Sequence, residues 1–160
     1  KLTYDYEQYF PINRHLIGSA RLGVGYADSY GETTDLPPYE KFFAGGIQSV
    51  RGYQGSSLGT RDEYNNPLGG NFRTIGQFEL LFPTLLGESR NTRFSLFLDA
   101  GNVFDNYEDF DAGTLRTSTG VGFQWLTPIL GLLEFAVAYP LNDEPGDDTE
   151  VFSFTFGATF

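Results

Sequence analysis

The sequence has 160 residues, a formal net charge of -11, 20 glycines and 17% aromatic residues. This length normally allows one domain with a full core, and the aromatic and glycine content favours strands and tight turns. The acidity argues against a nucleic-acid partner, because phosphates would be repelled. Cysteine is absent, which removes disulfides and thiolate metal sites from consideration. The sequence contains no run of eighteen apolar residues, so a transmembrane helix is excluded.

Apolar and polar residues alternate with a period of two along most of the chain, a pattern that predicts β-strands with one apolar face. The first two predicted strands, residues 1–10 and 16–27, place Tyr4 and Val24 on their apolar faces. The remaining predicted strands are residues 72–82, 93–103, 115–125, 132–139 and 151–160. About seven strands result, each close to the roughly 9–11 residues that a tilted strand needs to cross a bilayer.

This alternation fits two architectures: a soluble barrel or sandwich with an apolar interior, and a membrane barrel with an apolar exterior. The polar faces carry charged residues and many glycines, which suits a hydrated lumen. Large aromatic residues near the strand ends, such as Trp125 and Tyr139, match the interfacial girdle of a membrane barrel. These features favour an all-β fold, an antiparallel transmembrane β-barrel.

The predicted connections alternate between short and long. Pro11–His15 and Pro128–Gly131 are tight and Pro83–Thr92 is moderate, whereas residues 28–71, 104–114 and 140–150 are long and acidic. Short turns on one side and long loops on the other are typical of outer-membrane barrels. We expect the acids of the last two loops to lie at solvated tips. The alternative is that they bind divalent cations, which would bridge them to anionic lipid headgroups.

The number of strands is odd, which bears on closure of the barrel. Single-chain bacterial barrels have even strand counts, and the first strand pairs with the last. Seven strands by themselves would leave two unpaired edges in lipid, which is not tolerated. We therefore expect residues 1–160 to be part of a larger barrel, its C-terminal half.

The segment 28–71 is far longer than an ordinary connection and contains Val50-Arg51-Gly52-Tyr53 among apolar residues, so part of it should pack. By parity, Glu79 and Asp99 point to the inner faces of their strands. The planar guanidinium of Arg51 could bind both carboxylates and hold the loop inside the barrel.

The alternative is that Arg51 is solvent-exposed and that the two acids only hydrate the lumen; the chemistry of the residues leaves both possibilities open. The inward glycines Gly101, Gly120 and Gly122 would clear room for an inserted loop. Arg61 is expected in the outer part of the loop, where its replacement by alanine should have little effect.

Residues 44–53, with the sequence Ala-Gly-Gly-Ile-Gln-Ser-Val-Arg-Gly-Tyr, resemble the signature of the sixth extracellular loop in the BamA family of outer-membrane assembly factors. Further matches follow in chain order: Gly69-Gly70-Asn71, Phe78-Glu79-Leu80-Leu81-Phe82-Pro83, Asp99-Ala100-Gly101-Asn102-Val103-Phe104 and Gln124-Trp125-Leu126-Thr127-Pro128. Each match is weak by itself. Together they span nearly the whole sequence and are specific as a set.

The resemblance implies a sixteen-stranded barrel of which this chain supplies the last seven strands, with loop 28–71 inserted into the lumen. It implies that the loop anchor Val50, Arg51, Gly52 and Tyr53 contacts a wall formed by Glu79 and Asp99. In this family the final strand pairs weakly with the first and forms a lateral gate. Gly157 falls where that strand kinks, and Phe160 is its terminal aromatic residue.

The function implied is that of an insertase, which helps barrel proteins fold into the outer membrane of a Gram-negative bacterium. Its partners would be outer-membrane lipids, unfolded barrel substrates and accessory lipoproteins; no catalytic residue, cofactor, metal or nucleic acid is expected.

A TamA-type protein or a two-partner secretion transporter shares the Arg-Gly-aromatic signature, and a passive structural barrel is another alternative. His15 and the scattered serines form no nucleophile–base constellation, which argues against an enzyme.

Overall fold

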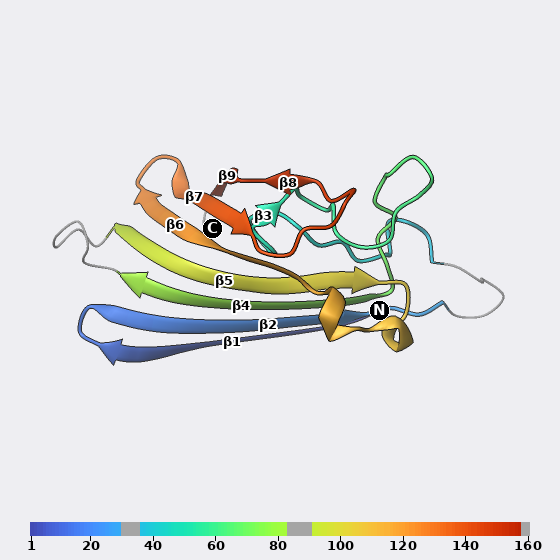
Figure 1. The fold of residues 1–160 in the computed structure, drawn as a ribbon. Coiled ribbons are helices and arrows are strands. Elements are labelled where there is room, and N and C mark those ends of the chain that lie inside the picture. Colours follow the sequence, from blue (N-terminus) through green and yellow to red (C-terminus); the bar gives the residue numbers. More distant parts are fainter. Residues whose placement is uncertain (30–35, 83–90, 158–160) are drawn as a thin grey trace.

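The computed structural model describes residues 1–29, 36–82 and 91–157 and shows one curved antiparallel sheet (Figure 1). Seven strands form it in the order β1-β2-β4-β5-β6-β7-β9. These strands are β1 (Leu2–Asn13), β2 (Leu16–Tyr26), β4 (Phe72–Phe82), β5 (Thr92–Phe104), β6 (Arg116–Thr127), β7 (Gly131–Pro140) and β9 (Phe152–Gly157). Two-residue strands β3 (Gly52–Tyr53) and β8 (Thr149–Glu150) pair separately, and two 3-10 helices, η1 (Tyr107–Asp109) and η2 (Ala112–Thr114), precede β6.

All seven predicted strands are present, and the predicted antiparallel β-architecture is confirmed. One predicted boundary is wrong, because β1 continues through Pro11 to Asn13 instead of turning at the proline. The register between β1 and β2 shifts between Pro11 and Asn13, and such an irregularity tolerates a residue that has no N–H to donate. The Asn13 side chain then accepts a hydrogen bond from the His15 backbone N–H at 2.8 Å and closes the turn.

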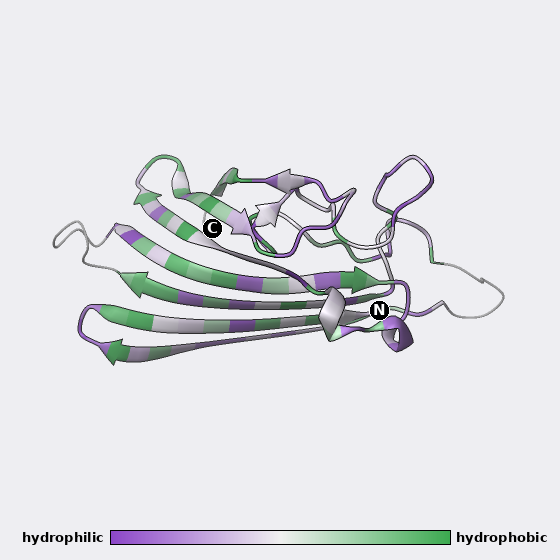
Figure 2. Cartoon of the chain, viewed as in Figure 1, coloured by the Kyte–Doolittle hydropathy of each residue, from purple (hydrophilic) through white to green (hydrophobic). Residues whose placement is uncertain are grey.

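The two faces of the sheet differ in polarity, and Figure 2 shows the alternation along each strand. Large apolar side chains on the convex face remain between 41% and 56% exposed: Leu22, Phe78, Leu96, Leu98, Val121, Val137 and Phe154. Ser19, Phe97, Asp99 and Ser118 on the opposite face are buried. A soluble sandwich would bury its apolar face, whereas this face is exposed over many strands, as a lipid-facing surface requires.

Four phenylalanines form a row on the convex face. Phe94, Phe123, Phe135 and Phe154 are register partners on β5, β6, β7 and β9. Their successive ring centroids are 4.8, 6.3 and 6.0 Å apart. Aromatic pairs at such distances contribute about 0.5–1.5 kcal/mol each beyond burial of their area. On the apolar face of the sheet, the row therefore connects β9 through β7 and β6 to β5.

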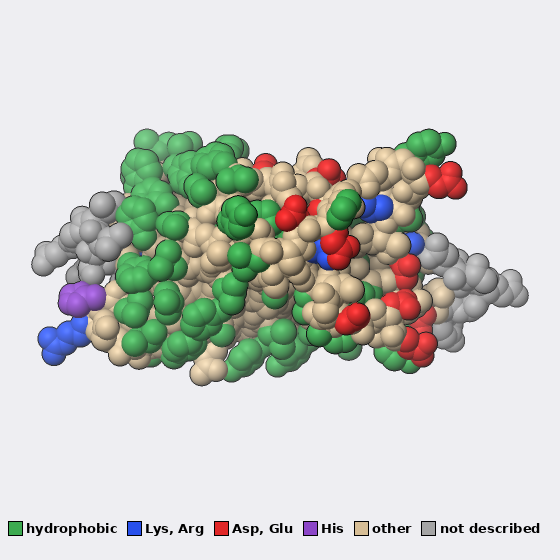
Figure 3. All heavy atoms as spheres, viewed as in Figure 1, with side chains coloured by type: hydrophobic (Ala, Val, Ile, Leu, Met, Phe, Trp, Pro, Cys, Tyr) green, Lys and Arg blue, Asp and Glu red, His purple; other side chains and the backbone are tan. Residues whose placement is uncertain are grey.

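The two ends of the sheet also differ. Hydrophobic side chains cover much of the surface over the strands, and acidic side chains gather at the end that carries the long loops (Figure 3). The predicted connection Pro83–Thr92 lies mostly outside the described residues, as do residues 30–35 and 158–160. No helix in the described ranges is long and apolar enough to span a bilayer.

Part of the long connection between β2 and β4 packs against the concave face of the sheet, where β3 lies (Figure 1). Its buried residues form a core with the sheet: Ala27, Phe42, Ala44, Val50, Tyr53, Leu58, Ile75 and Val103. Ile47 packs on a second cluster around Phe97. Tyr39 and Tyr64, by contrast, are 81% and 84% exposed. Burial in the loop is thus concentrated around residues 42–58.

Candidate functional site

A tight turn presents Arg51 to the wall of the sheet. The Gly46 backbone N–H donates to the carbonyls of Val50 and Tyr53, at 3.2 and 2.8 Å, and the Ser49 N–H donates to Gly46 at 3.0 Å. These bonds satisfy the backbone of a segment that is removed from water. The turn thereby presents the side chain of Arg51 to β4 and β5.

The Arg51 guanidinium is held by Asp99 of β5 through two parallel bonds. Its Nε and Nη2 donate to the two carboxylate oxygens, each at 2.7 Å, and the Arg51 backbone N–H donates to Asp99 Oδ2 at 3.1 Å. The Arg51 side chain is 2% exposed and that of Asp99 is 0% exposed. This bidentate geometry is the strongest form of charge-assisted hydrogen bonding, and here it is closed to solvent.

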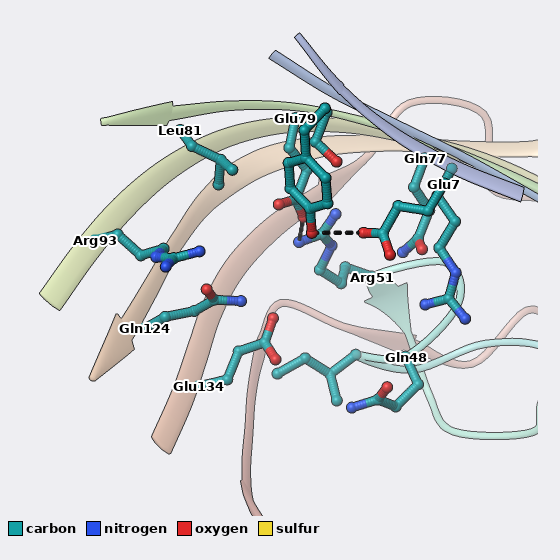
Figure 4. A pocket seen from close by; sticks show the side chains of 13 residues that line it. Glu7, Gln48, Arg51, Gln77, Glu79, Leu81, Arg93, Gln124 and Glu134 are labelled. Carbon is teal, nitrogen blue, oxygen red and sulfur yellow. Dashed lines mark hydrogen bonds and ion pairs between the residues drawn. The ribbon is translucent and has the colours of Figure 1, made fainter. Parts of the chain in front are cut away.

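Two further side chains complete the surroundings of Arg51. Nη1 forms an ion pair with Oε1 of Glu79 on β4 (Figure 4). The guanidinium carbon also lies 3.6 Å from the ring centroid of Phe97 on β5. The planar cation is thus bound at its edge by carboxylates and on its face by an aromatic ring, an arrangement that arginine can make and lysine cannot reproduce.

The positions of these wall residues follow from strand parity and register. Phe97 and Asp99 are two residues apart on β5 and therefore point to the same side. Glu79 pairs directly with Phe97, and Gln77 pairs with Asp99. The four side chains form a compact patch on two adjacent strands. The two acids that parity placed on the inner face therefore both contact the guanidinium of Arg51.

Two side chains hold the turn on either side of Arg51. Gln77 donates from Nε2 to the Ser49 carbonyl at 2.8 Å. Tyr53 is fully buried, and its hydroxyl lies 3.4 Å from the Thr117 carbonyl. Burial, followed by the charge of Asp147, raises the pKa of Tyr53 to about 12, so this hydroxyl is neutral and available as a donor at any physiological pH.

Gly52 is required at its position for two reasons. Its φ is +90°, and a Cβ atom there would lie 3.3 Å from the Cβ atoms of Ala138 and Ser118. Gly52→Ala is therefore expected to lower the free energy of unfolding by about 1–3 kcal/mol, through left-handed strain and crowding against β6 and β7. Denaturant unfolding of the full-length protein in lipid measures the change.

Gly55→Ala is the matched control for this substitution. Gly55 is exposed, and a Cβ atom built there meets nothing within 4 Å. The expected change is within about 0.5 kcal/mol. Equal losses in the two variants would show that the contacts of Gly52 with the wall do not matter.

The three inward glycines have different roles. A Cβ at Gly101 would lie 2.9 Å from Val50 Cγ2, so this glycine makes room for the inserted turn. A Cβ at Gly120 would lie 2.7 Å from Cζ of Phe97, so Gly120 makes room for the ring beneath Arg51. Gly122 instead faces the hydroxyl of Ser95, its register partner on β5.

A polar cavity of about 140 Å³ adjoins Arg51 (Figure 4). Its wall includes Arg93, Gln124 and Glu134, which form a continuous register row on β5, β6 and β7. Thr155 of β9 continues this row. The concave wall is thus hydrophilic between the docked turn and the end with the short connections.

Sequence reasoning did not single out Phe97 or Glu134 as site residues. Phe97 could have been found from its position in the strand, because it is a large aromatic residue on the same face as Asp99 and otherwise polar residues. Glu134 was visible as the one acid on the polar face of its strand, but its proximity to the loop depends on the curvature of the sheet. Neither residue could be assigned a partner from the pattern alone.

Of the two residues expected at a gate, one lies at the edge of the described structure. Gly157 is the last residue of β9 and pairs with Leu132 of β7, and a Cβ there would meet no atom within 4 Å. Phe160 lies outside the described residues. The kink at Gly157 and the anchoring by Phe160 stay predictions.

Arg61, which was expected in the outer part of the loop, is largely shielded from solvent. Its side chain is 14% exposed and forms an ion pair with Asp148 at 3.0 Å. It also donates to the carbonyls of Ser57 and Asn65, at 2.7 and 2.9 Å. These contacts favour the opposite expectation, that Arg61→Ala loosens the loop, because the side chain bonds to two points of the loop and to Asp148.

The acidic loops use many of their carboxylates internally. Asp147 and Glu144 bind Arg116, Asp148 binds Arg61, and Asp111 caps η2. Among residues 1–29, 36–82 and 91–157, no group of three or more His, Cys, Asp or Glu side chains is placed to hold a metal ion. The arrangement around Arg51 docks a loop and contains no nucleophile–base pair.

Comparison with known proteins agrees with the geometry. The model of the Omp85 superfamily domain matches residues 1–160. The chain belongs to the Omp85 superfamily. Among its relatives is the outer membrane protein assembly factor BamA of Neisseria meningitidis serogroup B, which is 36% identical over 187 residues and covers 99% of the chain. The corresponding protein of Nitratidesulfovibrio vulgaris is 30% identical over 161 residues and covers 97%.

A solved structure supports the same Omp85 assignment. The crystal structure of BamA from Haemophilus ducreyi lacking POTRA domains 1–3 superposes with a TM-score of 0.83 at 28% identity, over 95% of this chain and 33% of that one. The resemblance to the BamA family and the architecture as part of a β-barrel are thereby confirmed. The chain spans 23% and 19% of the length of the two relatives named above.

Proposed function

We propose that this chain is the C-terminal part of an outer-membrane insertase, which assists the folding and membrane insertion of β-barrel proteins in a Gram-negative bacterium. Its partners are outer-membrane lipids, unfolded barrel substrates and accessory lipoproteins. The process needs no covalent chemistry and no cofactor. A substrate strand adds to an exposed strand edge at a lateral gate, which is β-augmentation within the membrane.

The observation that carries this proposal is the docked loop. Arg51 is 2% exposed on the concave wall, bound to Asp99 and Glu79, in a chain similar to proteins named as outer membrane protein assembly factors. We assign Val50, Arg51, Gly52 and Tyr53 to anchoring, and Glu79 and Asp99 to the wall that receives them.

The gate is assigned to β9. Its register with β7 runs from Phe152–Val137 to Gly157–Leu132. Among the described residues, six of the ten residues of β7 are therefore paired with β9. Gly157 adds no side-chain packing there, which weakens a strand locally. A weak final strand lowers the barrier to opening the seam between it and the next strand of a closed barrel.

The test is an insertion assay with the full-length protein in liposomes. An unfolded, unrelated eight-stranded barrel is added, and its folding is followed by the heat-dependent shift in gel mobility. The wild-type protein should accelerate folding over empty liposomes, and Arg51→Ala should lower that acceleration about tenfold or more, because the unanchored loop leaves a buried carboxylate uncompensated.

Arg14→Ala is the control, since Arg14 lies exposed in the turn between β1 and β2 and its loss removes the same charge. Ion conductance without any acceleration of folding by the wild-type protein would instead identify a passive barrel, and the insertase proposal would fall.

A further inference from the structure

The inserted loop is joined directly to the segment that leads into the last strand. β3, which contains Gly52 and Tyr53 of the anchor, pairs with β8 in an antiparallel register. The pairing extends by a hydrogen bond of 2.8 Å from the Gln54 backbone N–H to the Asp148 carbonyl. The loop between β7 and β9 is therefore hydrogen-bonded to the loop that Arg51 holds against the wall.

Two arginines from different segments of the chain reinforce this junction. Arg61 of the inserted loop reaches Asp148 at 3.0 Å. Arg116, the first residue of β6, donates from Nε to Asp147 at 2.7 Å and forms an ion pair with Glu144 at 2.9 Å. We call Arg61, Arg116, Asp147 and Asp148 the loop clamp.

The strengths of these ion pairs differ with exposure. Arg116 and Asp147 are each 11% exposed, so this pair is partly removed from water and is worth more than a surface pair. Glu144 is 61% exposed, and its pair with Arg116 is screened by solvent. The Arg116–Asp147 bond is therefore the main ionic contact of the clamp with β6.

The clamped segment continues without a break into β9. Asp148 binds Gln54, residues 149–150 pair with β3, and the Val151 carbonyl accepts from the Ala138 N–H of β7 at 2.8 Å. β9 begins at the next residue, Phe152. The same ten residues, 148–157, thus bind the inserted loop at one end and β7 along the remainder.

We infer that Arg61 and Arg116 are positioning residues for the last strand: the loop clamp transmits docking of Arg51 to β9 and holds β9 in register on β7. This inference rests on the proposed function in assigning the gate to β9. When the clamp is intact, the segment before β9 is immobilised and the pairing of β9 starts from a fixed point. When it is broken, β9 can fray from its loop end and expose its edge.

Hydrogen–deuterium exchange on the full-length protein in lipid nanodiscs, without any substrate, tests the coupling. Arg116→Ala and Arg61→Ala should each raise the exchange rate of β9 amides (residues 152–157) about tenfold, since local opening no longer has to break the clamp. Exchange in β4 and in residues 92–100 of β5 should stay within about twofold. Arg116→Lys, which keeps the charge but loses the guanidinium fork, should give an intermediate rate.

A cross-link provides the second arm. The chain has no cysteine, and Gln54 and Asp148 face each other at the end of the β3–β8 pair. In Gln54→Cys/Asp148→Cys, the reduced protein lacks the ion pair of Arg61 with Asp148 and should show fast exchange in β9. The oxidised protein should return to the slow wild-type rate, including when Arg116→Ala is added.

Two outcomes would overturn the inference: unchanged exchange in β9 of Arg116→Ala, or equally accelerated exchange in β4 and β5, which would mean a general loss of stability. Because the measurement needs no substrate, it is independent of the insertion assay. A clamp that controls β9 in a protein that fails to insert substrates would refute the proposed function and leave the coupling intact. If the protein inserts substrates but the exchange of β9 does not depend on the clamp, the proposed function stands and the coupling is refuted.

Discussion

Replacement of Arg51 by alanine is expected to lower the free energy of unfolding by about 3–5 kcal/mol, the usual cost of removing one partner from a buried ion pair. Asp99 is 0% exposed and receives three hydrogen bonds from Arg51; the backbone bond can survive the substitution, but the two bonds from the guanidinium cannot. A buried carboxylate would be left without its cation. Guanidinium-induced unfolding in lipid measures the loss.

The same substitution should release the turn from the wall. Limited proteolysis within residues 44–58 should become at least about tenfold faster in Arg51→Ala. Arg51→Lys should fall between the alanine variant and the wild-type protein, because an ammonium group cannot bind Asp99 through two parallel bonds. Arg14→Ala should leave both readouts unchanged. If Arg51→Ala and Arg14→Ala behave alike, the ion pair does not hold the loop.

Replacement of Phe97 by alanine is expected to cost a similar amount, about 3–5 kcal/mol. Phe97 is 3% exposed, and its ring supports the guanidinium of Arg51 at 3.6 Å. The substitution removes buried apolar area and leaves a cavity beneath the cation. It also opens the space next to Gly120, where the ring now lies. Unfolding in denaturant gives the change in stability.

Phe97→Leu separates packing from the cation–π interaction. Leucine keeps most of the apolar volume but has no aromatic face, so a loss of about 1–2 kcal/mol would measure the interaction with Arg51. Residues that act on the same group do not have additive effects, so Arg51→Ala/Phe97→Ala should lose clearly less than the sum of the single variants. Strict additivity would show that the ring and the cation act independently.

A hydrated barrel wall can hold a loop tightly where water is kept away from the polar contacts. Water competes for every polar contact in an open lumen, and an exposed salt bridge there contributes about 1 kcal/mol or less. At Arg51 the competition is reduced, because Phe97 covers one face of the guanidinium and Val50 and Tyr53 are themselves fully buried. Apolar side chains on the turn therefore strengthen the ionic contact at its centre.

Periodicity in the sequence was sufficient to identify the seven strands and the apolar face of each. The alternation of side chains along a strand is a local property of the extended backbone. Parity also placed Glu79 and Asp99 on the inner wall, where both contact Arg51. It failed at Pro11, because a register shift that tolerates proline depends on the neighbouring strand and not on local pattern.

Only the tertiary structure decided which residues meet across the hollow of the sheet. The pairing of β3 with β8, the ion pair of Arg61 with Asp148 and the ring of Phe97 under Arg51 join residues that are 46 to 98 positions apart in the chain. Two-residue strands are too short to leave a periodic signal. The sequence alone predicts that a basic side chain in a polar loop is exposed to solvent, because it does not show whether an acid from a distant loop binds it. Side-chain direction is encoded locally, but partners are chosen by the register and curvature of the assembled sheet.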